Sequence, residues 1–84
     1  MTWSARIRQT ALKELSKIAK ADRRRTVRAI NDLPANPYRG SALKGDLTGL
    51  RRIRVGSCRV IYEVREAVLI VLVVAVGHRR NTYR

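Results

Sequence analysis

Cysteine is nearly absent from the sequence, which contains Cys58 alone among its 84 residues. A single cysteine cannot form an intrachain disulfide bond. Together with His78, the only histidine, it also provides too few ligands for a zinc site. The sequence therefore argues against a disulfide-stabilised fold and against a zinc centre, and we expect no metal ion or other cofactor.

Long hydrophobic runs are absent as well. The longest apolar stretch, Ala67 to Val76, has ten residues, whereas a membrane-spanning helix needs roughly 20. Its β-branched residues instead favour a central strand. The N-terminal segment lacks the apolar region of a signal peptide, so we expect no export and a cytoplasmic location.

Acidic residues are scarce: 6 Asp and Glu stand against 19 Lys and Arg, which gives a formal net charge of +13. So dense a positive charge attracts polyanions or an acidic protein partner. The length suits one domain with a single modest core, spanning residues 1–84. RNA, DNA or a neutralising protein is therefore the expected partner.

Hydrophobic periodicity predicts the first half of the fold. Residues 2–7 form a candidate edge strand. Residues 10–19 repeat apolar side chains at helical spacing, and a second helix runs from Asp22, its candidate N-cap, to Leu33 before Pro34 and Pro37 end it. The apolar positions of the first helix are Ala11, Leu12, Leu15, Ile18 and Ala19, and those of the second are Val27, Ile30 and Leu33. The two helices are expected to pack as a hairpin, followed by a loop over residues 34–49.

A β-hairpin is the clearest local signal in the chain. Gly56-Ser57 is a two-residue turn with glycine at its first central position. Counting outward from this turn places Val55 opposite Cys58 and Arg54 opposite Arg59, and opposed residues share one face of the ribbon. One face is apolar and should pack on the helices: Ile53, Val55, Cys58, Val60, Tyr62 and Val64. The other face carries Arg52, Arg54, Arg59 and Glu63.

Like charges directly opposite one another weaken a sheet, so the Arg54–Arg59 pair suggests an anion between them. The alternative is a solvated face of an antiparallel sheet, the usual location of a run of charges. The tail that follows the last strand adds Arg79, Arg80 and Tyr83. Arginines with an aromatic ring suit phosphate binding and base stacking, which favours a nucleic-acid site.

The stretch "LKGDLTGLRRIRVGSCRVIYEV", followed by an apolar strand and by "VGHRRNTYR", resembles the RelE/ParE superfamily of bacterial type II toxins. The likeness covers nearly the whole chain and is most specific in the hairpin and the tail. It implies an α+β fold of order β-α-α-β-β-β. In that fold one twisted, mainly antiparallel four-stranded sheet carries a two-helix hairpin on one face.

The resemblance leaves two activities open. RelE-like members are ribosome-dependent endoribonucleases that cut mRNA, whereas ParE-like members inhibit DNA gyrase. The RelE-like site falls on Arg52, Arg54, Arg59, Arg79 and Tyr83, and all these positions carry suitable chemistry. The interpretation is therefore an mRNA endoribonuclease of the RelE-like branch that inhibits translation, with a gyrase inhibitor or a non-catalytic nucleic-acid-binding module as the alternative. Its implied partners are a cognate antitoxin, the ribosome and mRNA.

The implied mechanism is attack of the RNA 2′-hydroxyl on the adjacent phosphate. Arg52 and Arg59 would stabilise the charged phosphate, Arg79 would assist the leaving oxygen, and Tyr83 would stack on a base or orient the 2′-hydroxyl. Arginine is a poor general base, and lysine occupies some of these strand positions in relatives. His78 is the candidate base, since histidine transfers protons near neutrality; a structural strand-end histidine is the alternative.

Further basic residues are candidate auxiliary contacts to RNA. For those on the second helix, a solvated helix face is an equally good interpretation. The auxiliary set is Arg23, Arg24, Arg28, Lys44, Arg51, Arg80 and Arg84.

Overall fold

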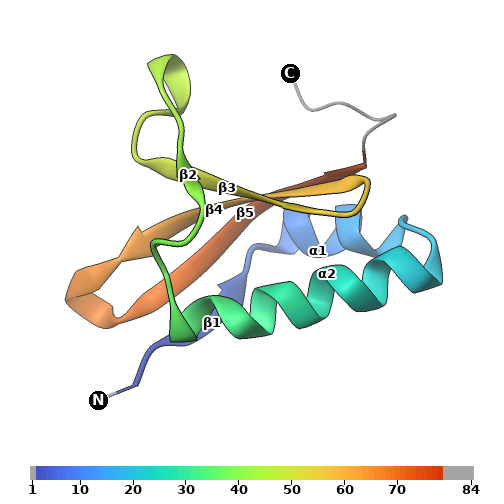
Figure 1. The fold of residues 1–84 in the computed structure, drawn as a ribbon, viewed down its shortest axis with the longest axis horizontal. Coiled ribbons are helices and arrows are strands. Elements are labelled where there is room, and N and C mark those ends of the chain that lie inside the picture. Colours follow the sequence, from blue (N-terminus) through green and yellow to red (C-terminus); the bar gives the residue numbers. More distant parts are fainter. Residues whose placement is uncertain (1, 79–84) are drawn as a thin grey trace.

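A computed structural model describes residues 2–78 of the chain (Figure 1), so Arg79, Arg80, Tyr83 and Arg84 lie outside the described residues. The strands are β1 (Ser4–Ile7), β2 (Ser41–Ala42), β3 (Leu50–Val55), β4 (Cys58–Arg65) and β5 (Ile70–His78). The helices are α1 (Gln9–Ser16) and α2 (Lys20–Asp32), with short 3₁₀ turns η1 (Leu33–Ala35), η2 (Gly45–Leu47) and η3 (Glu66–Val68). Both helices cover one face of the sheet and leave the other face open. Over residues 2–78, no helix has the length and apolar character needed to cross a bilayer.

The sheet has five strands in the order β1-β5-β4-β3-β2. The expectation of four strands was wrong, because the predicted loop over residues 34–49 contains β2, which pairs with β3 through Ser41–Arg52 and Ala42–Arg51. A strand of two residues is too short to show an alternating pattern. The sheet is also mixed, since β1 at the opposite edge runs parallel to β5. The α+β class and the placement of both helices on one face are as expected, whereas the element order differs from the predicted β-α-α-β-β-β by the insertion of β2 between α2 and β3.

The helix boundaries differ slightly from those predicted. Helix α1 ends at Ser16, and two of its expected core positions, Leu12 and Ala19, are exposed. Helix α2 begins at Lys20 with Ala19 as its N-cap, so Asp22 lies in the first turn rather than at the cap. A carboxylate in the first turn still stabilises the helix, because it lies near the positive end of the helix dipole.

The β3–β4 hairpin has the predicted register. Arg54 pairs with Arg59 and Val55 with Cys58 across the turn, and Gly56 takes a positive φ of 59°, which glycine adopts at little cost. The predicted apolar face of this hairpin packs on the helices. Its residues in the core cluster are Ile53, Cys58, Val60 and Tyr62, with Val55 and Val64 packed against that cluster.

A β-bulge sets the faces of β5. Ile61 pairs with Ala75, but the next residue, Tyr62, pairs with Val73, so Val74 is an extra residue in β5. An extra residue reverses the faces of the strand beyond it. Ala75 therefore lies on the open face beside Ile61, while His78, which pairs with Cys58, lies on the helix-covered face.

Candidate nucleic-acid interface

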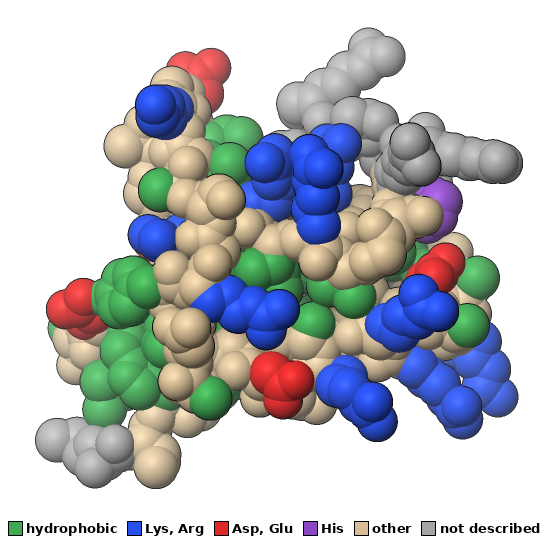
Figure 2. Space-filling model, viewed as in Figure 1, with side chains coloured by type: hydrophobic (Ala, Val, Ile, Leu, Met, Phe, Trp, Pro, Cys, Tyr) green, Lys and Arg blue, Asp and Glu red, His purple; other side chains and the backbone are tan. Residues whose placement is uncertain are grey.

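The open face of the β3–β4 hairpin brings together Arg52, Arg54 and Arg59, as the sequence predicts. Arg54 and Arg59 are directly paired across the two strands, and Arg52 pairs with Ile61. Figure 2 shows Lys and Arg side chains gathered above this hairpin, on the side away from the helices. Within residues 2–78, none of these three arginines forms an ion pair. Their positive charges are therefore available to an anionic ligand.

A cleft of about 140 Å³ lies between this arginine face and the η2 segment. Arg52 and Arg59 line it together with the apolar side chains of Leu43, Leu47 and Ile61. Ile61 is only 5% exposed although no helix covers this face. The arrangement combines an apolar surface, which suits a base or ribose, with guanidinium groups, which can bind phosphate bidentately. No carboxylate of the described residues lines the cleft.

Sequence reasoning missed Leu43 and Leu47, which precede β3 in the segment interpreted as a loop. The available signal was the pair of leucines in "LKGDL", which are unusual in a loop otherwise rich in Gly, Ser and Asn. Lys44, predicted as an auxiliary contact, lies between them and is exposed. It can therefore reach a ligand at the same side of the cleft.

Hydrogen bonds of the Tyr62 and Arg51 side chains hold residues 37–40, which lead into the segment that carries these leucines. The Tyr62 hydroxyl accepts a hydrogen bond from Gly40 N (2.9 Å) and donates one to Pro37 O (2.9 Å). Arg51 donates from Nε to Gly40 O (3.0 Å) and from Nη2 to Tyr38 O (3.1 Å), and its guanidinium lies over the Tyr38 ring, 5.3 Å from the centroid. The structure therefore uses Arg51, predicted as an auxiliary RNA contact, to anchor this loop.

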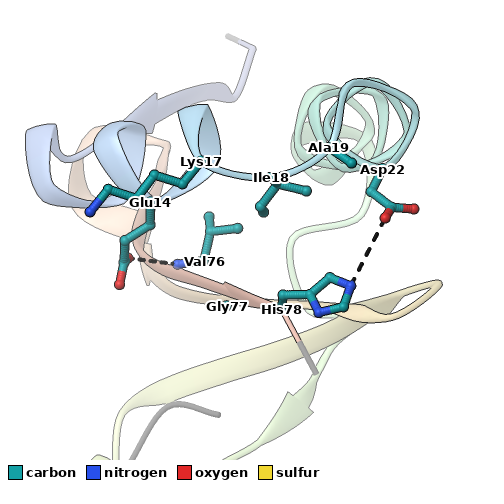
Figure 3. A pocket seen from close by; sticks show the side chains of 8 residues that line it. All are labelled: Glu14, Lys17, Ile18, Ala19, Asp22, Val76, Gly77 and His78. Atoms are coloured by element: carbon teal, nitrogen blue, oxygen red, sulfur yellow. Dashed lines mark hydrogen bonds and ion pairs between the residues drawn. The ribbon is translucent and has the colours of Figure 1, made fainter. Parts of the chain in front are cut away.

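His78 is not brought together with the arginines. The β5 bulge turns it towards the helices, where Nε2 lies 4.0 Å from Asp22 Oδ2 (Figure 3). The same pocket contains Glu14, whose Oε1 accepts a hydrogen bond from Val76 N at 3.0 Å. This placement gives no support to His78 as a general base beside Arg52 and Arg59.

The auxiliary arginines of α2 have different environments. Arg23 donates from Nη1 to Ser16 O (3.3 Å), which ties α2 to the end of α1. Arg24 and Arg28 are exposed. Among residues 2–78, no group of at least three His, Cys, Asp or Glu side chains is placed to hold a metal ion.

The family model of the ParE toxin of type II toxin–antitoxin systems matches residues 5–83. The chain belongs to this toxin family. A RelE-like toxin protein of Escherichia coli is 31% identical to this toxin over 87 residues, which cover 98% of the chain and 88% of the relative. The membership expected from the hairpin and tail motifs is thus confirmed at the level of the RelE/ParE superfamily.

Solved structures of related toxins share the fold. The toxin aligns with a chain of the RelBE2 toxin–antitoxin complex from Mycobacterium tuberculosis with a TM-score of 0.87 and 27% identity, covering 94% of this toxin and all of that chain (100%). The archaeal RelE–RelB complex from Pyrococcus horikoshii gives a TM-score of 0.76 and 27% identity over 98% of this toxin and 100% of that chain. The isolated Escherichia coli RelE toxin gives a TM-score of 0.77 and 21% identity over 93% of this toxin and 84% of that chain. At this level of identity the similarity concerns the fold alone.

Proposed function

We propose that this toxin is a ribosome-dependent endoribonuclease that cuts mRNA and thereby inhibits translation. The observation that supports the proposal is the cleft in which Arg52 and Arg59 flank an apolar surface with no carboxylate of the described residues among its lining. A polyanionic strand needs both features, a cationic rim for its phosphates and an apolar surface for a base. Ribosomes would place this activity in the cytoplasm.

The reaction proposed is attack of an RNA 2′-oxygen on its own 3′-phosphate. A bond forms between O2′ and phosphorus, the bond from phosphorus to the 5′-oxygen of the next nucleotide breaks, and a 2′,3′-cyclic phosphate remains. Arg52 and Arg59 would bind the phosphate oxygens and stabilise the negative charge that develops on them. Because arginine stays protonated, neither acts as the base. The proton of the 2′-hydroxyl is released to water, and the leaving 5′-oxygen takes up a proton from water. Arg79 remains a candidate for stabilising the negative charge on that leaving oxygen, and Tyr83 for stacking on a base or orienting the 2′-hydroxyl; both residues lie outside the described residues.

The partner in the cell is a cognate antitoxin, and the two form a hetero-oligomer. The structures from M. tuberculosis and P. horikoshii that resemble this toxin are complexes of a toxin with its antitoxin. A net charge of +13 favours an antitoxin segment that is acidic.

The test is primer extension on a translated mRNA, with and without ribosomes, comparing the wild type with Arg59→Ala. We expect cuts only on ribosomes, and a loss of about 10² to 10³-fold in the variant, the magnitude typical of removing one preorganised donor. Arg6→Ala is the matched control, because Arg6 pairs with Leu72 on the same open face of the sheet but on the distant edge strand β1. Full activity of a folded Arg59→Ala variant would contradict the assignment of this cleft.

Inhibition of DNA gyrase is the second candidate, because the family model that matches residues 5–83 is that of the ParE toxin. A supercoiling assay with purified gyrase distinguishes the two. A toxin that blocks gyrase and leaves translated mRNA intact would reject the endoribonuclease and establish the second function.

A further inference from the structure

The cleft lined by Arg52 and Arg59 has a floor of small residues. Ala75 pairs with Ile61 across β4 and β5 and lies on the open face of the sheet. Gly77, two residues further along, pairs with Arg59 and lies on the same face. If the β5 bulge were absent, the neighbouring valines would stand opposite these two partners. The bulge therefore leaves room in the cleft that two larger side chains would fill.

The opposite wall of the cleft is braced by its own hydrogen bonds. It belongs to residues 43–50, which project from the sheet between β2 and β3 (Figure 1). Leu43 N donates to Leu50 O (2.9 Å) and closes the base of this segment. Within the segment, Thr48 donates to Gly45 O from its backbone N (3.1 Å) and from its Oγ1 (2.7 Å). A wall that is formed before the ligand enters can discriminate ligands by size.

The volume of the cleft, about 140 Å³, limits what its apolar part can hold. An apolar cavity of about 150 Å³ in another protein binds benzene, a single six-membered ring. A pyrimidine base is one such ring, whereas a purine base carries a second, fused ring. One pyrimidine therefore fits between the wall and the floor, and a purine would leave its second ring outside.

The polar groups of the cleft suit the phosphate beside such a base. Among the described residues that line it, Arg52 and Arg59 carry the only charged side chains. Asp46 belongs to the projecting segment, but it is exposed and does not line the cleft. The remaining side chains of the lining are aliphatic and offer a base no hydrogen bonds. Discrimination between bases would therefore rest on ring size.

We propose that the cleft selects a pyrimidine nucleotide adjoining the phosphate that is cut, and that Leu47, Ala75 and Gly77 set the size limit. This selection rests on the proposed endoribonuclease function. In an apolar pocket, a difference of one methylene group changes kcat/KM by about 10- to 200-fold. The second ring of a purine is larger than a methylene group, so cutting beside pyrimidines should exceed cutting beside purines by at least about tenfold.

The experiment measures kcat/KM of the full-length toxin on ribosomes, with mRNAs that differ only in the nucleotides flanking one cut site. Leu47→Ala widens the cleft, so the purine-to-pyrimidine ratio of kcat/KM should rise by at least about fivefold. Leu12→Ala is the matched control, because Leu12 is 53% exposed on α1, which covers the other face of the sheet. Its ratio should stay within about twofold of the wild type, as expected for a surface substitution. A loss of stability alone would lower both rates and leave their ratio unchanged.

A second measurement tests the cleft without ribosomes. The toxin is titrated with uridine 3′-monophosphate and with adenosine 3′-monophosphate, and the methyl resonances of Leu43, Leu47 and Ala75 are followed by NMR. The uridine nucleotide should shift these resonances and bind at least about tenfold more tightly than the adenosine nucleotide.

The outcomes separate the inference from the function on which it rests. If the wild type cuts no mRNA on ribosomes, the proposed function fails, and selection during cleavage fails with it. If the wild type cuts beside purines and pyrimidines equally well, or if Leu47→Ala keeps the wild-type ratio, the inference is overturned while the proposed function stands. Equal affinities for the two nucleotides, or shifts confined to other methyl groups, would likewise overturn it.

Discussion

Replacing Tyr62 by Phe removes one buried hydroxyl group and leaves the aromatic ring in the core. Tyr62 is 0% exposed, and its hydroxyl connects Gly40 N and Pro37 O, each at 2.9 Å. In the variant both backbone groups would lose this partner at a site where the side chain leaves no access to water. A buried polar group without a partner destabilises the folded state.

The magnitude follows from these two contacts. An unsatisfied buried donor costs about 1–3 kcal/mol, and loss of the second hydrogen bond adds about 1 kcal/mol. We expect the free energy of unfolding to fall by about 2–4 kcal/mol, against a total of roughly 4–13 kcal/mol for a domain of this length. The melting temperature should fall by about 10 to 20 °C.

Urea denaturation measures this loss, with an unchanged m value showing that the comparison is valid. Tyr38→Phe is the control: its hydroxyl hydrogen-bonds the exposed Glu66 carboxylate, and we expect a change of no more than about 0.5 kcal/mol. Hydrogen exchange of the Gly40 amide should accelerate in Tyr62→Phe and stay slow in Tyr38→Phe. A loss below about 0.5 kcal/mol in Tyr62→Phe would refute the reasoning, because it would mean that water or a backbone shift satisfies both groups.

Two further substitutions test the same region of the sheet. Gly40→Ala would place a Cβ atom 2.6 Å from the Tyr62 hydroxyl and 2.8 Å from the backbone oxygen of Arg52, so we expect urea denaturation to show a loss of about 1–3 kcal/mol; a stability equal to that of the wild type would contradict the close packing. Arg54→Thr removes one member of the Arg54–Arg59 pair and should stabilise the protein by about 0.2–1 kcal/mol at low salt. Thermal unfolding should show this gain shrinking at about 1 M salt, where the charges are screened, and a loss of stability at low salt would reject the proposed repulsion.

The sequence by itself determined the β3–β4 hairpin and the arginine face. A two-residue turn with glycine at its first position fixes the register locally, and strict alternation then assigns every side chain to a face. Arg52, Arg54 and Arg59 therefore lie together as predicted. The same alternation places Arg51 on the opposite face, but only the fold shows what it contacts there, the backbone of Tyr38 and Gly40.

The placement of Leu43 and Leu47 in the lining of the cleft was decided by the tertiary structure. Leu43 and Leu47 reach it because a two-residue strand pairs with β3 and because Tyr62, 22 residues away in sequence from Gly40, hydrogen-bonds that loop. A contact across that sequence separation leaves no periodic signal in the segment itself. The loop was therefore recognisable from its composition, while its conformation was not.

The orientation of His78 was also decided by the tertiary structure. The run from Ala67 to Val76 is apolar throughout, so it carries no alternation that could specify which residues face the helices. The bulge opposite Ile61 and Tyr62 inserts one extra residue into β5. If the Tyr62–Val73 register continued without this bulge, His78 would lie on the open face with the arginines. A strand that is apolar on both faces takes its register from the packing of its neighbours, and here that packing places the only histidine beside Asp22.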